Sequence, residues 1–570
     1  MNRVRLVVLV AVATVVGMVA FGLWSRPAVE GIEHDGFSAE RVVEDIEVIS
    51  REHHSVAHPE ERATVRDYLT RRLGELGADT IKLYNYEALV GPENKHVVYT
   101  FDATNILAEF APRDAAKEYT SLMLVAHYDS RYSQPMPHRD TVWSYGAADD
   151  GYGVGVILET VAQALKYRDE WQQGVKVLFT DAEEVGMMGM KAQWQNNHEV
   201  FDNVGLMINL EARGPYGPTL LFETSPNNER LMELYATTAD YPCTYSLTTV
   251  VYGFMPNFTD FTIAKDTIPG FNFSTIADIN HYHTDKDNFS NINPQSIQHY
   301  GAQIVPIVHK YLTDSTYSDK DSLRGERGTV NFTLPLLGLF NFSMPCYWVI
   351  NIVVFVAFAL LFAFDTLRGR VQIRESLGAA LRALISAIVA LVAGELIAWV
   401  ACRVCDAEFK PFGIVQGIAG DNIIMAVSVV VMIAIVAALY MRGRRGAVRL
   451  TAGSLRANAG ANAALLHATN SLYGALIVMF VLSLALIVAI GENLMFFIPL
   501  LAATAAIILY RTTRLRLWLI VAIALILLHA LSFLYALAMA LTIGAFGAVL
   551  MLALLDAVVI IPLTELYTRK

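Results

Sequence analysis

The pattern of apolar and polar residues divides the chain into a short apolar N-terminus and two long parts. Between Ser38 and about Arg327, charged and apolar residues are mixed as they are in globular domains. From Cys346 onward, long apolar runs with almost no acidic residues follow one another. At roughly 100–200 residues per domain, the first long part could be one large domain or two small ones. The predicted segments are residues 1–28, 29–327 and 328–570.

Short β-rich runs alternate with helical patterns in residues 29–327. The predicted strands are residues 97–110, 121–130, 175–181, 204–212 and 219–224. The predicted helices are residues 38–50, 59–76, 151–167 and 293–312. Strands that alternate with helices of this length are typical of an α/β domain, in which helices cover both faces of a mostly parallel sheet. Ligands of such domains bind beyond the carboxyl ends of the strands.

An apolar run of about 19 residues follows the basic N-terminal sequence MNRVR. This length is enough to cross a hydrocarbon core of about 30 Å. The alternative is a cleaved signal peptide, but the flank SRPAVEG has no small-x-small cleavage site directly behind the apolar run. We therefore expect an uncleaved anchor helix, and under either interpretation the following domain is exported.

Residues 328–570 contain further apolar stretches that are long enough to be transmembrane helices. The predicted spans are residues 347–365, 378–401, 423–441, 470–490, 494–510, 517–537 and 545–563. The connecting loops alternate between basic and non-basic, and cytoplasmic loops carry the excess of Lys and Arg. This alternation fits about eight spans, with both termini cytoplasmic and the globular domain extracytoplasmic. That side is the outside of a bacterial cell membrane or the lumenal side of a eukaryotic internal membrane.

Composition adds little to this picture and excludes one class of partner. The mean hydropathy of +0.40 reflects the apolar second half, and the net charge is −11 without any basic stripe, so we expect no nucleic-acid binding. The spacing C-x-x-C of Cys402 and Cys405 has no second pair that would complete a zinc site. Glu395, His529 and Asp556 lie within predicted spans, where an ionisable group is a functional candidate unless it pairs with a neighbouring helix.

Histidines and carboxylates follow the predicted strands of the globular domain at the points where the strands end. They are His127, Asp129, Glu183, Glu184 and Glu211, while Asp149 and Asp150 open the predicted helix 151–167 and His283 follows the strand-like sequence IPGFNFS at 268–274. One such residue is usually solvated, but several at one edge of a sheet would repel each other unless cations held them together. Histidine and carboxylate ligands without thiolates suit zinc in a hydrolytic site. Two metal ions about 3.5–4 Å apart need a carboxylate that binds both.

These residues resemble those of the co-catalytic di-zinc aminopeptidases, metallopeptidase family 28. The similarity is greatest to the endoplasmic-reticulum metallopeptidase branch, whose members also carry a multi-span membrane half. It covers roughly residues 38–315 and rests on the motifs HYDS, GAADDGYG, DAEEVG, INLEARG, NFTDF and YHTDKD, in the family's order. The resemblance implies two zinc ions per chain and a peptide substrate.

The resemblance also implies a role for each matching residue. Asp149 would bridge the two zinc ions. His127 and Glu211 would complete the ligands of one ion, and Glu184 and His283 those of the other. Many soluble members carry Asp at the position of Glu211, whereas this branch has Glu there.

Further roles follow from the same motifs. Glu183 would be the general base, and Asp129 would orient the His127 imidazole. Asp260 and Asp287 stand at positions that the family also keeps acidic. Several soluble members have an oxyanion-stabilising Tyr where this chain has Pro256, so the oxyanion donor is open, with Tyr252 and Tyr282 as possible substitutes.

Two other functions fit parts of the pattern. One is a glutaminyl-cyclase-like transferase that uses a single zinc ion, and the other is a non-catalytic receptor or transport protein. The second ligand set argues against the first, and the retained base and ligands argue against the second. The sequence does not decide between an exopeptidase and an endopeptidase, nor does it give the oligomeric state.

Overall fold

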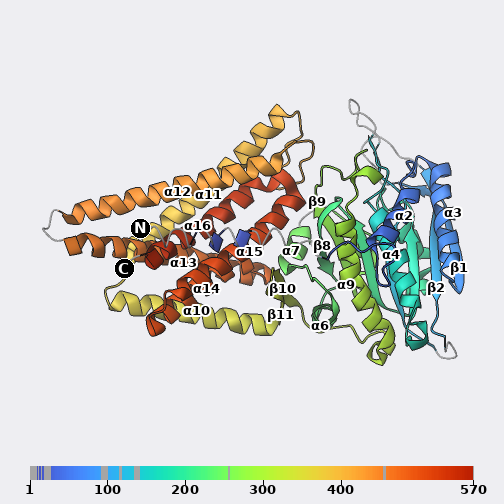
Figure 1. Cartoon of the computed structure of the whole chain (residues 1–570), viewed down its shortest axis with the longest axis horizontal. Helices are drawn as coiled ribbons and strands as arrows, with labels where there is room; N and C mark the ends of the chain where they lie inside the picture. The colour runs from blue at the N-terminus through green and yellow to red at the C-terminus, as the bar shows by residue number, and fades with distance from the viewer. Residues whose placement is uncertain are drawn as a thin grey trace. The chain divides into compact units, whose positions relative to one another are not determined.

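Figure 1 shows the computed structural model of the chain. The structure describes residues 27–91, 100–113, 118–133, 142–253, 257–452 and 457–568, with scattered positions between 9 and 17. Apart from those positions, the predicted anchor helix lies outside the described residues. The described chain separates into two compact units, one ending at Thr333 with the addition of Leu337–Ser343, and one made mainly of the residues from Met344 onward.

The first unit is built on a seven-stranded sheet in the order β1-β2-β6-β3-β7-β9-β8. Its strands are β1 (Thr80–Val90), β2 (Thr100–Phe110), β3 (Ser121–His127), β6 (Gly174–Thr180), β7 (Val204–Ala212), β8 (Tyr216–Thr224) and β9 (Gly270–Ala277). The central strands β6, β3, β7 and β9 are parallel, whereas the pairs β1–β2, β2–β6 and β8–β9 are antiparallel. The α/β prediction is confirmed, and the sheet is mixed at both edges.

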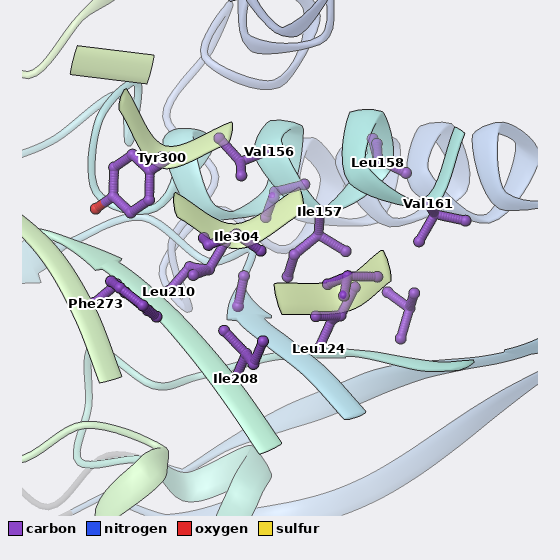
Figure 2. Packing of buried hydrophobic residues seen from close by; sticks show 14 of the residues in the cluster. Leu124, Val156, Ile157, Leu158, Val161, Ile208, Leu210, Phe273, Tyr300 and Ile304 are labelled. Atoms are coloured by element: carbon purple, nitrogen blue, oxygen red, sulfur yellow. The ribbon is translucent and has the colours of Figure 1, made fainter. Parts of the chain in front are cut away.

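Helices cover both faces of this sheet because alternate strand side chains point to opposite sides. Leu122 and Leu124 of β3 belong to one core, while Met123 and Val125 belong to the other. Figure 2 shows the first core, where Leu124, Ile208, Leu210 and Phe273 of the sheet face residues of α4 and α9. The helices of the unit are α2 (Ala39–Ile49), α3 (Pro59–Glu75), α4 (Gly151–Leu165), α5 (Met188–Asn196), α6 (Glu229–Thr238), α7 (Ser246–Gly253), α8 (Phe261–Ala264) and α9 (Pro294–Thr313).

A hairpin extends the first unit beyond the predicted boundary at residue 327. Its strands are β10 (Thr329–Leu334) and β11 (Gly338–Ser343). The backbone nitrogen of Thr333 donates to the carbonyl of Thr244, and the Ser246 hydroxyl donates to the carbonyl of Asn331. These bonds attach β10 to the segment that leads into α7.

The second unit consists of long apolar helices. They are α10 (Met344–Leu367), α11 (Ile373–Val404), α12 (Asp421–Ala452), α13 (Ala457–Ile490), α14 (Leu494–Thr513), α15 (Leu517–Leu541) and α16 (Phe546–Thr568). Within the described residues, six stretches are long and apolar enough to cross a membrane, and the last of them contains both α15 and α16. A 3₁₀ turn, Thr542–Ala545, joins these two helices, which pack against each other. They therefore form a helical hairpin, while the number of spans stays a prediction.

Candidate functional site

The predicted site residues meet at the carboxyl ends of the parallel strands. His127 ends β3, and Glu211 lies in the last residues of β7. Glu184 follows β6, and His283 follows β9. Asp149 stands two residues before α4, at a cis peptide bond with Asp150. The topology thus brings together residues that are more than 150 positions apart in the sequence.

Two ligand clusters share the Asp149 carboxylate. In the first, His127 Nε2 lies 3.3 Å from Asp149 Oδ1 and 3.9 Å from Glu211 Oε2. In the second, His283 Nε2 lies 3.2 Å from Asp149 Oδ2 and 3.1 Å from Glu184 Oε2. Within each cluster the potential ligand atoms are all within 4.8 Å of one another, close enough to surround one ion. The arrangement has the form that the sequence predicts, with one carboxylate between two metal positions.

Several buried atoms in these clusters make no hydrogen bond, although they lie close to other polar atoms. Within the described residues they include Asp149 Oδ2, Glu184 Oε1 and His283 Nε2. A buried polar atom without a partner is costly, because it has lost water and gained nothing in return. Carboxylate oxygens and imidazole nitrogens with this arrangement fit Zn²⁺ or a similar ion. The side chain of His127 is 1% exposed and that of His283 is 24% exposed, so the second cluster has an open side.

Asp129 orients the site in a way that differs from the expectation. His127 Nδ1 lies 2.9 Å from the backbone carbonyl of Asp129 and 3.5 Å from its carboxylate. An Nδ1–H that donates to this carbonyl leaves the Nε2 lone pair directed at the cluster. The Asp129 carboxylate instead accepts bonds from the backbone nitrogens of Glu183, at 2.9 Å, and Glu184, at 3.3 Å. Asp129 therefore positions His127 through its backbone and the glutamate pair through its side chain.

The glutamate pair lies in a turn just beyond β6. Ala182 has a φ of 57°, in the left-handed region, and the backbone nitrogens of Gly186 and Met187 donate to the carbonyl of Glu183. This turn separates the Glu183 and Glu184 side chains. Glu184 is buried in the second cluster, whereas Glu183 is half-buried.

Asp287 and Asp260 support the site from outside the two clusters. Asp287 accepts bonds from the backbone nitrogens of Ala148, at 2.7 Å, and Asp149, at 3.3 Å, and from the Ser144 hydroxyl, at 2.9 Å. It thereby fixes the segment that carries the shared carboxylate. Asp260 accepts a short bond from the Thr180 hydroxyl at the end of β6.

The electrostatics of the site favour bound cations. Burial raises the pKa of Glu183 well above its usual range, and the neighbouring charge of Glu211 adds to this effect. Burial also raises the pKa of Glu211 to about 8. Burial alone would lower the pKa of His127, but hydrogen bonds to Asp129 and Asp149 raise it well above the ordinary value. Without cations Glu183 and Glu211 hold protons, and a metal ion bound in the first cluster would displace the proton of Glu211.

Arg131 is a member of the site that sequence reasoning did not single out. Its guanidinium donates to the backbone carbonyl of Glu184 and lies 3.1 Å from Glu184 Oε2. This contact neutralises part of the negative charge beside the second cluster. The only sequence signal is that Arg131 follows the HYDS motif directly.

Of the three positions considered for the oxyanion donor, Tyr252 stands out. It lies on α7, its ring meets Phe222 edge-on at 4.9 Å, and its buried hydroxyl has no hydrogen-bond partner among the described residues. Tyr282 stacks on His283, with ring centroids 3.6 Å apart. Pro256 lies outside the described residues.

Comparisons with known proteins agree on the domain type. The family model described as Peptidase family M28 matches residues 105–308. Endoplasmic reticulum metallopeptidase 1 of Mus musculus is 29% identical over 251 residues, which are 43% of this chain and 26% of that protein. The vacuolar membrane protease of Schizosaccharomyces pombe is 26% identical over 332 residues, 55% of this chain and 36% of that protein. The chain thus spans about a quarter to a third of the length of these relatives.

Two bacterial proteins are among the solved structures that match about half of this chain. One is a Zn-dependent exopeptidase from Parabacteroides distasonis, with a TM-score of 0.36 and 21% identity, covering 48% of this chain and 98% of that one. The other is a glutaminyl cyclase from Porphyromonas gingivalis, with a TM-score of 0.38 and 20% identity, covering 49% of this chain and 100% of that one.

Proposed function

Because the family model described as Peptidase family M28 matches residues 105–308, we propose that the chain is a membrane-anchored zinc peptidase of the aminopeptidase type. The observation that carries the proposal is the pair of ligand clusters that share Asp149. The relatives named as a metallopeptidase and as a membrane protease support the proposal of a membrane-anchored peptidase. Two complete ligand sets favour a two-metal hydrolase over a transferase that uses one zinc ion.

In this proposal the two clusters hold two Zn²⁺ ions. His127, Glu211 and Asp149 would hold one ion, and Glu184, His283 and Asp149 would hold the other. The orphaned buried atoms of Asp149, Glu184 and His283 are the structural support for these assignments. Bound zinc would supply Lewis acidity and lower the pKa of a water molecule toward about 7. Asp129 and Asp287 position the ligands through the hydrogen bonds described above.

Glu183 moves the proton in the proposed mechanism. Its carboxylate, beside the clusters but in neither of them, takes a proton from the water that attacks the peptide carbonyl. The same side chain then gives the proton to the leaving amine nitrogen. The burial that raises the pKa of Glu183 makes its carboxylate a stronger proton acceptor than an exposed glutamate.

Tyr252 is the proposed donor to the oxyanion that forms on the substrate carbonyl. Burial raises the pKa of its hydroxyl well above the usual range, so the group keeps its proton and remains a donor. The charges of Glu223, Glu211 and Glu183 add to this shift, so the hydroxyl lies within electrostatic range of Glu211 in the first cluster and of the proposed base. An unpartnered, buried donor at this position fits a group whose partner is the substrate.

Membrane attachment follows from the second unit. The proposed topology places the peptidase unit on the extracytoplasmic side and both termini in the cytoplasm. The alternation of basic and non-basic loops supports it.

Metal analysis of the purified full chain tests the proposal. We expect about two zinc ions per chain, together with hydrolysis of small aminoacyl substrates. Asp149→Ala should lose both ions or nearly all activity, because removing a shared carboxylate weakens two sites together. Two retained ions with near-normal turnover in this variant would disprove the ligand assignment.

A further inference from the structure

Arg213 stands beside the candidate site without belonging to either ligand cluster. It lies two residues beyond Glu211, and its backbone nitrogen donates to the carbonyl of Thr275 at 2.9 Å, which continues the pairing of β7 with β9. Arg213 lies in the bend just past the end of β7, and the charges of both Arg213 and Glu211 act on the Tyr252 hydroxyl, so the two side chains lie in the same region of the unit.

Aromatic contacts connect Arg213 to the open side of the second cluster. The guanidinium carbon lies 5.7 Å from the centroid of the Tyr282 ring. Tyr282 in turn stacks on His283, which is the most exposed of the predicted ligands. A guanidinium over an aromatic face is favourable and is desolvated on that side. Tyr282 thus lies between Arg213 and the position where a substrate can reach the site.

Two other basic side chains of this unit, Arg131 and Lys265, form ion pairs with carboxylates, whereas Arg213 forms none within the part of the chain that the structure describes. Arg131 contacts Glu184, and Lys265 forms an ion pair with Glu223 at 2.5 Å. Among the described residues, no carboxylate lies within 4.0 Å of the Arg213 guanidinium, which makes only the aromatic contact. The side chain is half-buried. A half-buried guanidinium beside a group of carboxylates, yet paired with none, has its donors available for a ligand.

We infer that Arg213 binds a carboxylate of the peptide substrate, an inference that rests on the proposed peptidase function. The guanidinium presents donors in a planar fork that matches a carboxylate at two points. A short peptide offers such a group at its C-terminus, and an acidic residue offers one in its side chain. In either case the proposed enzyme prefers substrates that carry a carboxylate close to the cleaved bond.

The test compares four peptides on the zinc-loaded full chain in detergent. Leu-Leu and its C-terminal amide differ only in the terminal carboxylate, while Leu-Glu amide and Leu-Gln amide differ only in a side-chain carboxylate. We expect one of the carboxylate peptides to have a kcat/KM at least about tenfold above its amide counterpart, mainly through a lower KM, since a hydrogen bond to a charged group is worth about that much. The pair that shows the difference identifies the source of the carboxylate.

Variants assign the preference to Arg213. Arg213→Gln should remove the difference within the pair while the amide peptides are hydrolysed as before. Arg213→Lys should keep part of the difference in kcat/KM within the pair. Arg230→Gln, on α6, is the matched control and should behave as the unchanged protein. Equal hydrolysis within both pairs, or an equal loss on all four peptides in Arg213→Gln, would overturn the inference and leave the proposed function intact. A protein that hydrolyses none of the four would disprove the proposed function, and the inference with it.

Discussion

Glu183 and Glu184 are neighbours in the sequence but face different surroundings. Glu184 reaches His283 within 3.1 Å, while Glu183 belongs to neither ligand cluster. The turn that begins at Ala182 separates them, and Asp129 fixes both through their backbone nitrogens. Single substitutions can therefore test the proposed roles separately, with Glu184 as a metal ligand and Glu183 as the general base.

Glu183→Gln should keep its metal ions and fold but lose most of its activity. Gln has nearly the same shape as Glu and cannot accept a proton, so kcat should fall by about 10²–10⁴. Glu184→Gln is the matched variant and should lower metal content as well, because it removes a charged ligand. Metal stoichiometry and kcat, measured on both variants, separate the two roles. Metal loss in Glu183→Gln with retention in Glu184→Gln would mean that the roles are exchanged.

Tyr252→Phe should reduce kcat by about 10²–10³, the usual effect of removing one oxyanion donor. KM should change little, because the donor acts on charge that develops in the transition state. The ring keeps its contact with Phe222, so unfolding should occur at an unchanged temperature. Normal kcat in this variant would assign the oxyanion donor elsewhere.

The residues of the two clusters could be predicted from the sequence because each one lies at the end of a recognisable strand or within a motif. His127 and Glu211 come at the ends of apolar runs, where a parallel sheet collects its functional groups. Arg131 directly follows the HYDS motif and Arg213 lies within INLEARG, but neither motif predicts which groups its arginine contacts. The role of the Asp129 carbonyl also depends on backbone geometry, which residue types do not reveal.

Among the elements, α9 shows how a buried histidine couples the fold to pH. His299 Nδ1 accepts a bond from the backbone nitrogen of Thr219 on β8, at 3.0 Å, and its Nε2 donates to the carbonyl of Tyr241, at 2.8 Å. Only the neutral ring can make both bonds. Burial accordingly lowers the pKa of His299 to about 4.

The peptidase unit should lose stability as the pH falls from about 6.5 toward 4. In this range the unfolded state binds a proton at His299 and the folded state does not, so up to about 3 kcal/mol of the free energy of unfolding is lost. Above pH 6.5 this contribution is fully present. Thermal unfolding of the full chain at pH 7 and pH 5 measures the effect. His299→Asn, whose amide oxygen can accept the Thr219 bond, should show a smaller drop, and an equal drop would exclude His299 as the cause.

The strands show where sequence patterns stop being informative. The four parallel strands are apolar runs that are buried on both faces, and the sequence analysis recognised their composition. Strand β1, at the edge of the sheet, was not predicted, because most of its residues are exposed and its composition is mixed. The antiparallel pairing of β8 with β9 was also missed, since strand direction depends on the connections rather than on the strand itself. The predicted Glu395, His529 and Asp556 lie on α11, α15 and α16, whereas the ion pair of Asp365 with Arg511 had not been singled out.

At the scale of the whole molecule, two units with different surroundings share one chain. The first has two buried cores around a sheet, and the second exposes apolar side chains along its helices, as lipid-facing helices do. Their separation agrees with the change in composition near residue 340. The side of the membrane on which each loop lies remains a prediction from loop charge.

Cysteine labelling of intact cells tests this topology. In a cysteine-free background, Lys320→Cys should react with a membrane-impermeant reagent from the extracytoplasmic side, whereas Ala452→Cys should react only after permeabilisation. Removal of the natural cysteines is needed because Cys346 and Cys405 are exposed. The reverse pattern would invert the topology, and equal labelling would mean that the span count is wrong.

The unequal exposure of His127 and His283 has a consequence for how the protein would acquire its ions. The position beside His127 is the more deeply buried of the two, so an ion bound there should exchange slowly with the surroundings. The position beside His283 stays open and exchanges with the ions of its surroundings. The ion beside His127 would therefore reflect the metal ions available where the protein is synthesised. The ion beside His283 would reflect those available where the protein acts.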